Sequence, residues 1–205
     1  MNELKLKNQE LLSQIVEITE LKKENEALRT ALELGLEKDF QLELAQVIGK
    51  DPSRDSISIN KGLQDGVSKD MAVITSQKVL LGRIGEVYQG FSEVILISNK
   101  ESSFDAKIVK QEIYPVRNNI SNGVYGIIRG KGSLEVSFEL IPKEEEISPG
   151  ELVVTASLGG VFPQGLLIGE IEEIKKSDIE PFQRATIKTS FNLKNLDNLF
   201  IITNF

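Results

Sequence analysis

The chain contains no histidine and no cysteine among its 205 residues. Without these side chains it cannot form a Ser-His-Asp or Cys-His catalytic arrangement, an imidazole or thiolate zinc site, or a disulfide framework. Oxygen ligands alone can hold a hard metal ion, but the sequence has no Asp-x-Asp-x-Asp-Gly loop or comparable spacing. We therefore expect no catalytic residues, no metal site and no cofactor.

Basic residues are fewer than acidic ones, 24 against 31, which gives a net charge of -7. Nucleic-acid-binding proteins usually carry a basic face, and the only basic cluster here is Arg129–Lys131, so we expect no nucleic-acid partner. Long apolar runs are also absent, and Met1–Lys5 resembles neither a signal peptide nor a membrane span. The chain as given is expected to be soluble, with any membrane anchor upstream of it.

Residues 1–37 contain no proline and one glycine, Gly35, and their apolar residues have helical spacing. With Leu4 at heptad position a, the d positions Lys7 and Gln14 are polar, so the apolar seam is continuous only in the second half of the helix. The predicted dimerisation residues at a and d are Ile18, Leu21, Asn25, Leu28 and Leu32.

Charges beside this seam favour a parallel, two-stranded coiled coil. Glu17 and Glu24 occupy g positions and Lys22 and Arg29 occupy e positions, which allows g to e' pairs between chains. Asn25 at an a position favours the same register. The alternative is a lone amphipathic helix that packs on its own domain.

A repeated pattern dominates the rest of the chain. Val67–Thr75 and Ile147–Thr155 match each other, and each is followed by an aliphatic-Gly-x-Ile-x-Glu-aliphatic run, Leu81–Val87 and Ile168–Ile174. The second copy holds seven extra residues between its two halves. The sequence therefore predicts a mainly β fold with two related modules, one of which carries an elaborated loop.

Short strand-like runs separated by turn residues fit two small β-barrels. We expect a coiled-coil helix at 1–37, a first barrel at 38–115, a linker at 116–123 and a second barrel at 124–205. The last strand, Leu199–Thr203, closes either the second barrel or the first. The predicted strands are 42–48, 56–60, 72–75, 79–87, 94–97, 104–110, 124–129, 134–141, 152–156, 166–174, 185–190 and 199–203.

The extra residues of the second copy form a glycine-rich loop with an apolar tip. Its candidate partner-binding residues are Gly159, Gly160, Val161, Phe162 and Pro163, with Val161 and Phe162 as apolar anchors of the kind that dominate interfaces. The alternative is a barrel corner that simply needs glycines. A phosphate cradle is disfavoured because no Lys-Ser/Thr pair follows the loop.

Four segments of the sequence carry motifs that belong together. The most specific is Gly159–Pro163, which lies within a longer match over Val153–Gly169. The others are Glu24–Arg29, at the end of the coiled coil, Ala45–Pro52 and Ile59–Val67. Together they resemble the bacterial rod shape-determining MreC family, and the resemblance covers nearly the whole chain.

This resemblance implies the extracytoplasmic (periplasmic) part of a single-pass protein of the bacterial cytoplasmic membrane, with a coiled coil and two β-barrels. It implies a non-enzymatic, homodimeric scaffold of the cell-elongation machinery that maintains cell shape. The implied partners are a class B penicillin-binding protein, which it positions or activates for peptidoglycan synthesis, MreD and the MreB filament. The variable linker around Asn118 and the polar upper seam depart from the family pattern.

Two other functions remain open from the residues. A periplasmic adaptor of a membrane assembly also combines coiled coil and β domains, although such adaptors usually place a helical hairpin between β segments. A carboxylate-based cell-wall hydrolase needs only paired acids. The acids of this chain cluster in Lys143–Glu146 and Glu170–Glu173, which are typical of solvated surface.

Overall fold

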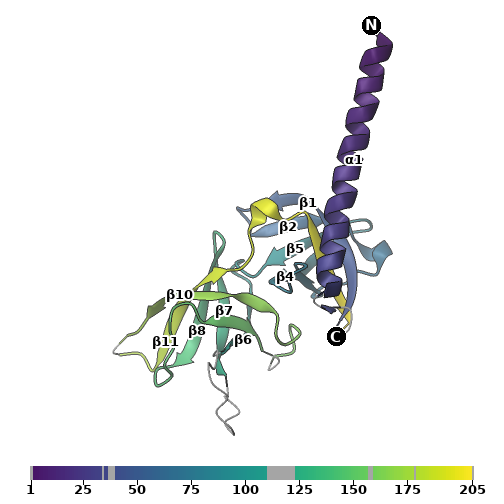
Figure 1. The fold of residues 1–205 in the computed structure, drawn as a ribbon. Helices are drawn as coiled ribbons and strands as arrows, with labels where there is room; N and C mark the ends of the chain where they lie inside the picture. The colour runs from purple at the N-terminus through teal and green to yellow at the C-terminus, as the bar shows by residue number, and fades with distance from the viewer. Residues whose placement is uncertain are drawn as a thin grey trace.

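The computed structural model describes residues 2–33, 35–36, 40–109, 123–156, 159–177 and 179–204. Within these ranges the chain is one helix followed by β structure (Figure 1). The elements are α1 (Asn2–Glu33), β1 (Gln41–Asp51), β2 (Ser56–Ile59), η1 (Leu63–Asp65), β3 (Ala72–Ile74), β4 (Leu80–Val87), β5 (Ser92–Leu96), β6 (Ser103–Val109), β7 (Val124–Gly132), β8 (Glu135–Pro142), β9 (Leu152–Thr155), β10 (Leu167–Lys175), β11 (Phe182–Thr189), η2 (Leu193–Asn195) and β12 (Asn198–Asn204).

The strands form two closed antiparallel barrels with the same circular order. The circular strand order is β12-β3-β4-β5-β2-β1 in the first barrel and β6-β9-β10-β11-β8-β7 in the second, written so that β3 and β9 hold the same place. The hairpins β3–β4 and β9–β10, which contain the repeated sequence patterns, therefore hold equivalent places. The mainly β prediction of two related barrels is confirmed.

The predicted domain boundary was wrong by one strand. β6 was expected in the first barrel, but it pairs with β7 and β9 of the second barrel. The chain crosses between the barrels at residues 97–102, immediately after β5. Periodicity identifies a strand but not its neighbour, and β6 pairs with the next strand along the chain, as consecutive strands usually do. Of the predicted linker 116–123, all but Gly123 lies outside the described residues.

β12 closes the first barrel, the second of the two placements that the sequence left open. It lies between β1 and β3, so the second barrel is inserted into the first between β5 and β12. Alternate residues of β12 point to opposite sides. Leu199 and Ile201 belong to the interior of the first barrel, whereas Phe200 and Ile202 belong to a second apolar cluster that includes the interior of the second barrel.

The end of the helical region rests on the outside of the first barrel. Leu36 is fully buried and belongs to the same cluster as Phe200 and Ile202, which are also buried. Phe40 lies partly buried in this cluster, with the ammonium group of Lys78 5.1 Å from its ring centroid. The C-terminal part of α1 lies alongside the first barrel, and its N-terminal part extends away from both barrels (Figure 1).

Candidate functional site

The glycine-rich loop connects β9 to β10 and is fixed at its base by one threonine. The Thr155 hydroxyl donates a hydrogen bond to the Pro163 carbonyl at 2.5 Å and accepts one from the Leu166 amide at 2.9 Å. Gly160 and Gly165 have φ values of +66° and +85°, a conformation that glycine adopts without steric cost. The described part of the loop, residues 159–166, is therefore held at the end of the second barrel.

Phe162 folds back into the second barrel instead of projecting outward. Its side chain is only 4% exposed and meets Phe104 edge to face, with 4.7 Å between ring centroids and 80° between ring planes. Pro163 is buried as well. The prediction that Phe162 and Pro163 contact a partner is therefore corrected, because an apolar ring at this position gains more by filling the barrel end than by remaining in water.

The other three predicted contact residues lie at the surface. Gly159 and Gly160 are exposed, and the Val161 side chain is 41% exposed. The two interpretations of the loop thus apply to different residues. Phe162 and Pro163 hold the loop in place, and Val161 at its tip is available for contact.

The first copy of the repeat shows what the insertion adds. The Thr75 amide donates to the Val79 carbonyl at 2.9 Å, and the Thr155 amide donates to the Leu166 carbonyl at the same distance. The threonines therefore hold equivalent positions, but a short turn follows Thr75 and a long loop follows Thr155. The two connections also meet, because the Leu167 amide donates to the Lys78 carbonyl at 3.0 Å.

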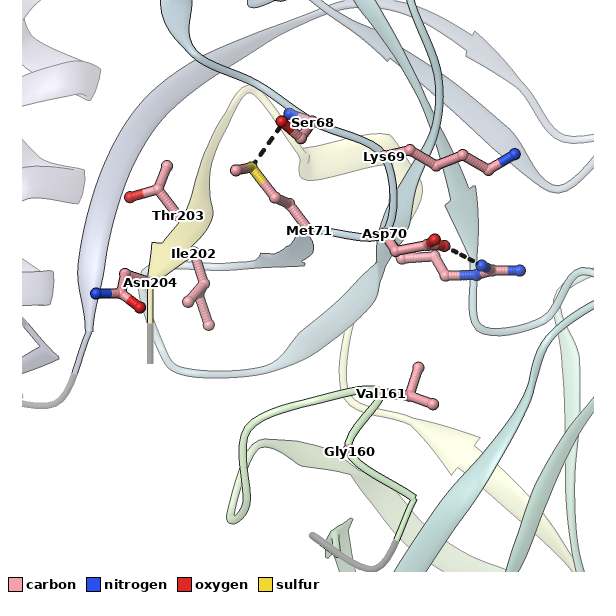
Figure 2. A pocket seen from close by; sticks show the side chains of 10 residues that line it. Ser68, Lys69, Asp70, Met71, Gly160, Val161, Ile202, Thr203 and Asn204 are labelled. Atoms are coloured by element: carbon pink, nitrogen blue, oxygen red, sulfur yellow. Dashed lines mark hydrogen bonds and ion pairs between the residues drawn. The ribbon is translucent and has the colours of Figure 1, made fainter.

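A cleft of about 550 Å³ lies between the loop and the first barrel. Figure 2 shows Gly160 and Val161 on one side, facing Asp70, Met71 and the end of β12 on the other. The residues that line it are Ser68, Lys69, Asp70, Met71, Arg83, Gly160, Val161, Ile202, Thr203 and Asn204. Both barrels contribute walls, so the cleft exists only while they keep this orientation.

The charges of the cleft lie on the first-barrel side. Arg83 forms an ion pair with Asp70, and the Lys69 ammonium lies 3.9 Å from the Glu86 carboxylate. The opposite wall, at Val161, is apolar. A cleft with paired charges beside an exposed aliphatic side chain is better suited to bind a protein surface than to bind a free phosphate, because phosphate binding needs unpaired cations or a helix N-terminus.

The predicted dimerisation residues form an exposed stripe along α1. The exposed fractions are 64% for Ile18, 57% for Leu21, 38% for Leu28 and 60% for Leu32, and Asn25 is exposed too. Exposed apolar side chains at a and d positions are what an unpaired coiled-coil strand presents.

The opposite face of the helix lies against the first barrel. Lys23, Ala27 and Thr30, at f and c positions of the same heptads, share a groove with the β3–β4 turn and the segment before β12. The Lys23 ammonium donates to Asp197 at 2.9 Å, and this hydrogen bond raises the pKa of Lys23 above its ordinary value. The helix thus packs on its own domain through its polar face, and the apolar seam points elsewhere.

The acidic segments considered for a hydrolase lie at the surface. Glu170 on β10 forms an ion pair with Lys188 at 2.8 Å, and Glu173 lies 3.5 Å from Lys175. Among the described residues, no group of three or more acidic side chains is placed to hold a metal ion. No helix in the described part of the chain is long and apolar enough to span a membrane.

Sequence reasoning missed the first-barrel wall of the cleft. Ser68–Met71 lies within the first copy of the repeat, and Ile202–Asn204 is the end of β12, the strand that closes that barrel. The repeat was the available signal, since it marked the Ser68–Met71 segment. The return of β12 to the first barrel, which places Ile202–Asn204 in the cleft, could not be derived from strand periodicity.

Comparison with known proteins identifies the family. Residues 47–203 match the family model described as rod shape-determining protein MreC, barrel core. The cell shape-determining protein MreC of Listeria monocytogenes is 31% identical over 206 residues, which cover 97% of this chain and 66% of that protein. The MreC of Escherichia coli is 29% identical over 98% of this chain and 51% of its own length. The chain thus spans only one half to two thirds of these relatives.

Solved structures show the same architecture. A structure of Listeria monocytogenes MreC is 28% identical and covers 98% of this chain and 93% of its own, with a TM-score of 0.68. A complex between the penicillin-binding protein PBP2 and MreC from Helicobacter pylori is 19% identical, with a TM-score of 0.58, and covers 80% of this chain and all of that one. Together with the family match over the barrel residues, these findings place the chain in the MreC family of cell shape-determining proteins.

Proposed function

We propose that this chain is the extracytoplasmic part of a homodimeric, non-enzymatic scaffold that positions or activates peptidoglycan synthases during bacterial cell elongation. The observation that carries the proposal is that the two faces of α1 have different surroundings. Its polar face packs on the first barrel through Lys23, and its apolar seam at Ile18, Leu21 and Leu28 is left exposed. A second copy of the same helix is the partner that this heptad pattern fits.

The dimer would present two identical pairs of barrels at the end of a stalk. α1 has 32 residues and is therefore about 48 Å long at about 1.5 Å per residue. In this arrangement the N-terminal ends of both helices lead toward a membrane anchor upstream of the chain. A location on the outer side of the cytoplasmic membrane, and joint action with MreD and the MreB filament, belong to this proposal.

The synthase partner is proposed to be a class B penicillin-binding protein. Support comes from the related Helicobacter pylori protein, whose structure is a complex with PBP2. On this chain the proposed contact is the cleft wall at Gly159–Val161, where Val161 is 41% exposed at the tip of an anchored loop. A fixed loop with one projecting aliphatic side chain binds with little loss of conformational entropy.

A pull-down with the ectodomain of a class B penicillin-binding protein tests the contact. Val161→Asp places a charge at the proposed interface, and we expect at least about tenfold weaker binding, equivalent to about 1.4 kcal/mol. Val109→Asp is the matched control, because Val109 lies on the same barrel and is 40% exposed. Sedimentation equilibrium of the same samples measures whether each is a dimer.

The outcomes separate the parts of the proposal. Loss of capture for Val161→Asp alone, in a dimer with normal circular dichroism, supports both the partner and the site. Equal capture by all three chains removes the loop from the interface. A parent chain that stays monomeric at all concentrations contradicts the dimeric scaffold.

A further inference from the structure

One buried carboxylate joins the two barrels. Asp55 lies in the turn between β1 and β2 of the first barrel and is only 3% exposed. Its Oδ1 accepts hydrogen bonds from the Ser98 hydroxyl at 2.7 Å and from the Leu134 amide at 2.7 Å. Its Oδ2 accepts one from the Ser133 amide at 2.9 Å. Ser133 and Leu134 form the tip of the β7–β8 hairpin of the second barrel.

The hairpin tip has a backbone conformation that its residues do not favour. Ser133 and Leu134 have φ values of +57° and +65°. Two consecutive positive φ angles in a two-residue hairpin loop are typical of Asn-Gly or Gly-Gly sequences, not of Ser-Leu. Asp55 itself has a φ of +47°. Such conformations persist where the surrounding structure holds them, so the strained residues of both barrels mark their junction.

Further contacts hold the same hairpin against the segment that crosses between the barrels and against the first-barrel core. The Gly132 amide donates to the Ser98 carbonyl at 2.8 Å. A Cβ on Gly130 would lie 2.0 Å from the Asn99 carbonyl oxygen, so only glycine permits this approach. The Leu134 side chain is partly buried against the core of the first barrel. The hairpin is therefore held by the crossing segment through backbone contacts, and by the first barrel through the Asp55 carboxylate and the apolar contact of Leu134.

We infer that Asp55 is a positioning residue that latches the β7–β8 hairpin and fixes the orientation of the second barrel on the first. Since the walls of the cleft come from both barrels, the latch also sets the distance between Met71 and Val161. A neutral amide cannot replace it. Asparagine would turn a donor toward the Ser133 or Leu134 amide, which would leave at least one of these N–H groups without its acceptor.

Distance measurements between spin labels test the latch without any partner, so the result is independent of the proposed function. The chain has no native cysteine. Lys69→Cys on the first barrel and Glu172→Cys on β10, both at exposed positions, therefore carry the only labels. Pulsed electron paramagnetic resonance then gives the distribution of distances between the barrels. Labelled chains are diluted with unlabelled ones, so that distances within one chain dominate.

The matched control is Asp65→Asn. Asp65 also accepts a backbone hydrogen bond, from the Gly62 amide at 3.0 Å, and pairs with Lys61, but all these partners lie in the first barrel. We expect the parent and Asp65→Asn to give one narrow peak. Asp55→Asn is expected to lose that peak and give a broad or displaced distribution, while amide spectra show both barrels folded.

An unchanged narrow peak in folded Asp55→Asn overturns the inference. If Asp55→Asn does not fold, Asp55→Gly decides instead, because glycine adopts the φ of +47° without steric cost and removes the carboxylate without turning a donor toward the hairpin amides. Broadening in Asp55→Gly supports the latch, and a narrow peak at the parent distance refutes it.

Discussion

Replacing Phe162 tests whether the glycine-rich loop is anchored in the second barrel. The ring is 4% exposed and contacts Phe104 edge to face. Truncation of a core phenylalanine to alanine costs about 3–5 kcal/mol. Because Phe162 is held on a connection that can partly collapse into the cavity, we expect Phe162→Ala to cost about 3 kcal/mol, near the lower end of this range.

Thermal unfolding followed by far-ultraviolet circular dichroism measures this cost, since the chain has no tryptophan for fluorescence. For a protein of this size, 1 kcal/mol lowers the Tm by about 2–4 °C, so Phe162→Ala should melt about 6–12 °C below the parent. Val161→Ala is the neighbouring control. Its side chain is 41% exposed, and its Tm should stay within about 2 °C of the parent.

The contact with Phe104 can be measured separately. A double-mutant cycle with Phe104→Ala should give a coupling free energy of about 0.5–1.5 kcal/mol, the usual value for an edge-to-face pair. A Phe162→Ala chain that melts within about 2 °C of the parent would refute the reasoning, because the ring would then contribute no more than an exposed residue.

Two further predictions concern the helix and the last strand. Leu21→Glu together with Leu28→Glu should convert the proposed dimer to a monomer with both barrels folded, because the exposed seam is the proposed interface. The control Leu12→Glu, at an equally exposed position outside the seam, should have the same mass as the parent in sedimentation equilibrium, and a double variant that stays dimeric would exclude this seam. A chain truncated after Ser190 loses β12, and with it Leu199 and Ile201 of the first-barrel core. Limited proteolysis should therefore digest the first barrel and spare a fragment close to 103–189, and equal resistance of both barrels would contradict the insertion topology.

Strand positions could be predicted from the sequence because each has a local signal. The short apolar run Leu199–Thr203 predicts a strand, and β12 covers that segment. The barrel in which it lies depends on contacts with β1 and β3, more than 100 residues earlier in the chain. Local periodicity carries no information about such pairings, which is why β6 was assigned to the first barrel and β12 was left undecided.

Only part of the candidate site could be predicted, again because local sequence signals do not report contacts between distant residues. The repeat identified the loop at Gly159–Pro163 as an insertion, and glycine content predicted its turns. Which of its two apolar side chains is exposed depends on the space beside Phe104 at the end of the barrel. Asp55 gave no signal at all, because it lies in an ordinary polar turn and its partners at Ser133 and Leu134 are almost 80 residues away.

The repeat also explains why the cleft lies where it does. In both copies a threonine stands at the end of the first strand of the hairpin, Thr75 after β3 and Thr155 in β9. The amide of each threonine closes the following connection with a backbone hydrogen bond. The short first connection brings Lys78 against the start of β10, which fixes one point of contact between the barrels. Asp55 and the β7–β8 hairpin fix a second point. With two points held, the longer connection after Thr155 can extend Val161 toward Met71 without itself supporting the junction. A substitution at Val161 should therefore alter what the cleft binds, whereas one at Asp55 should alter the cleft.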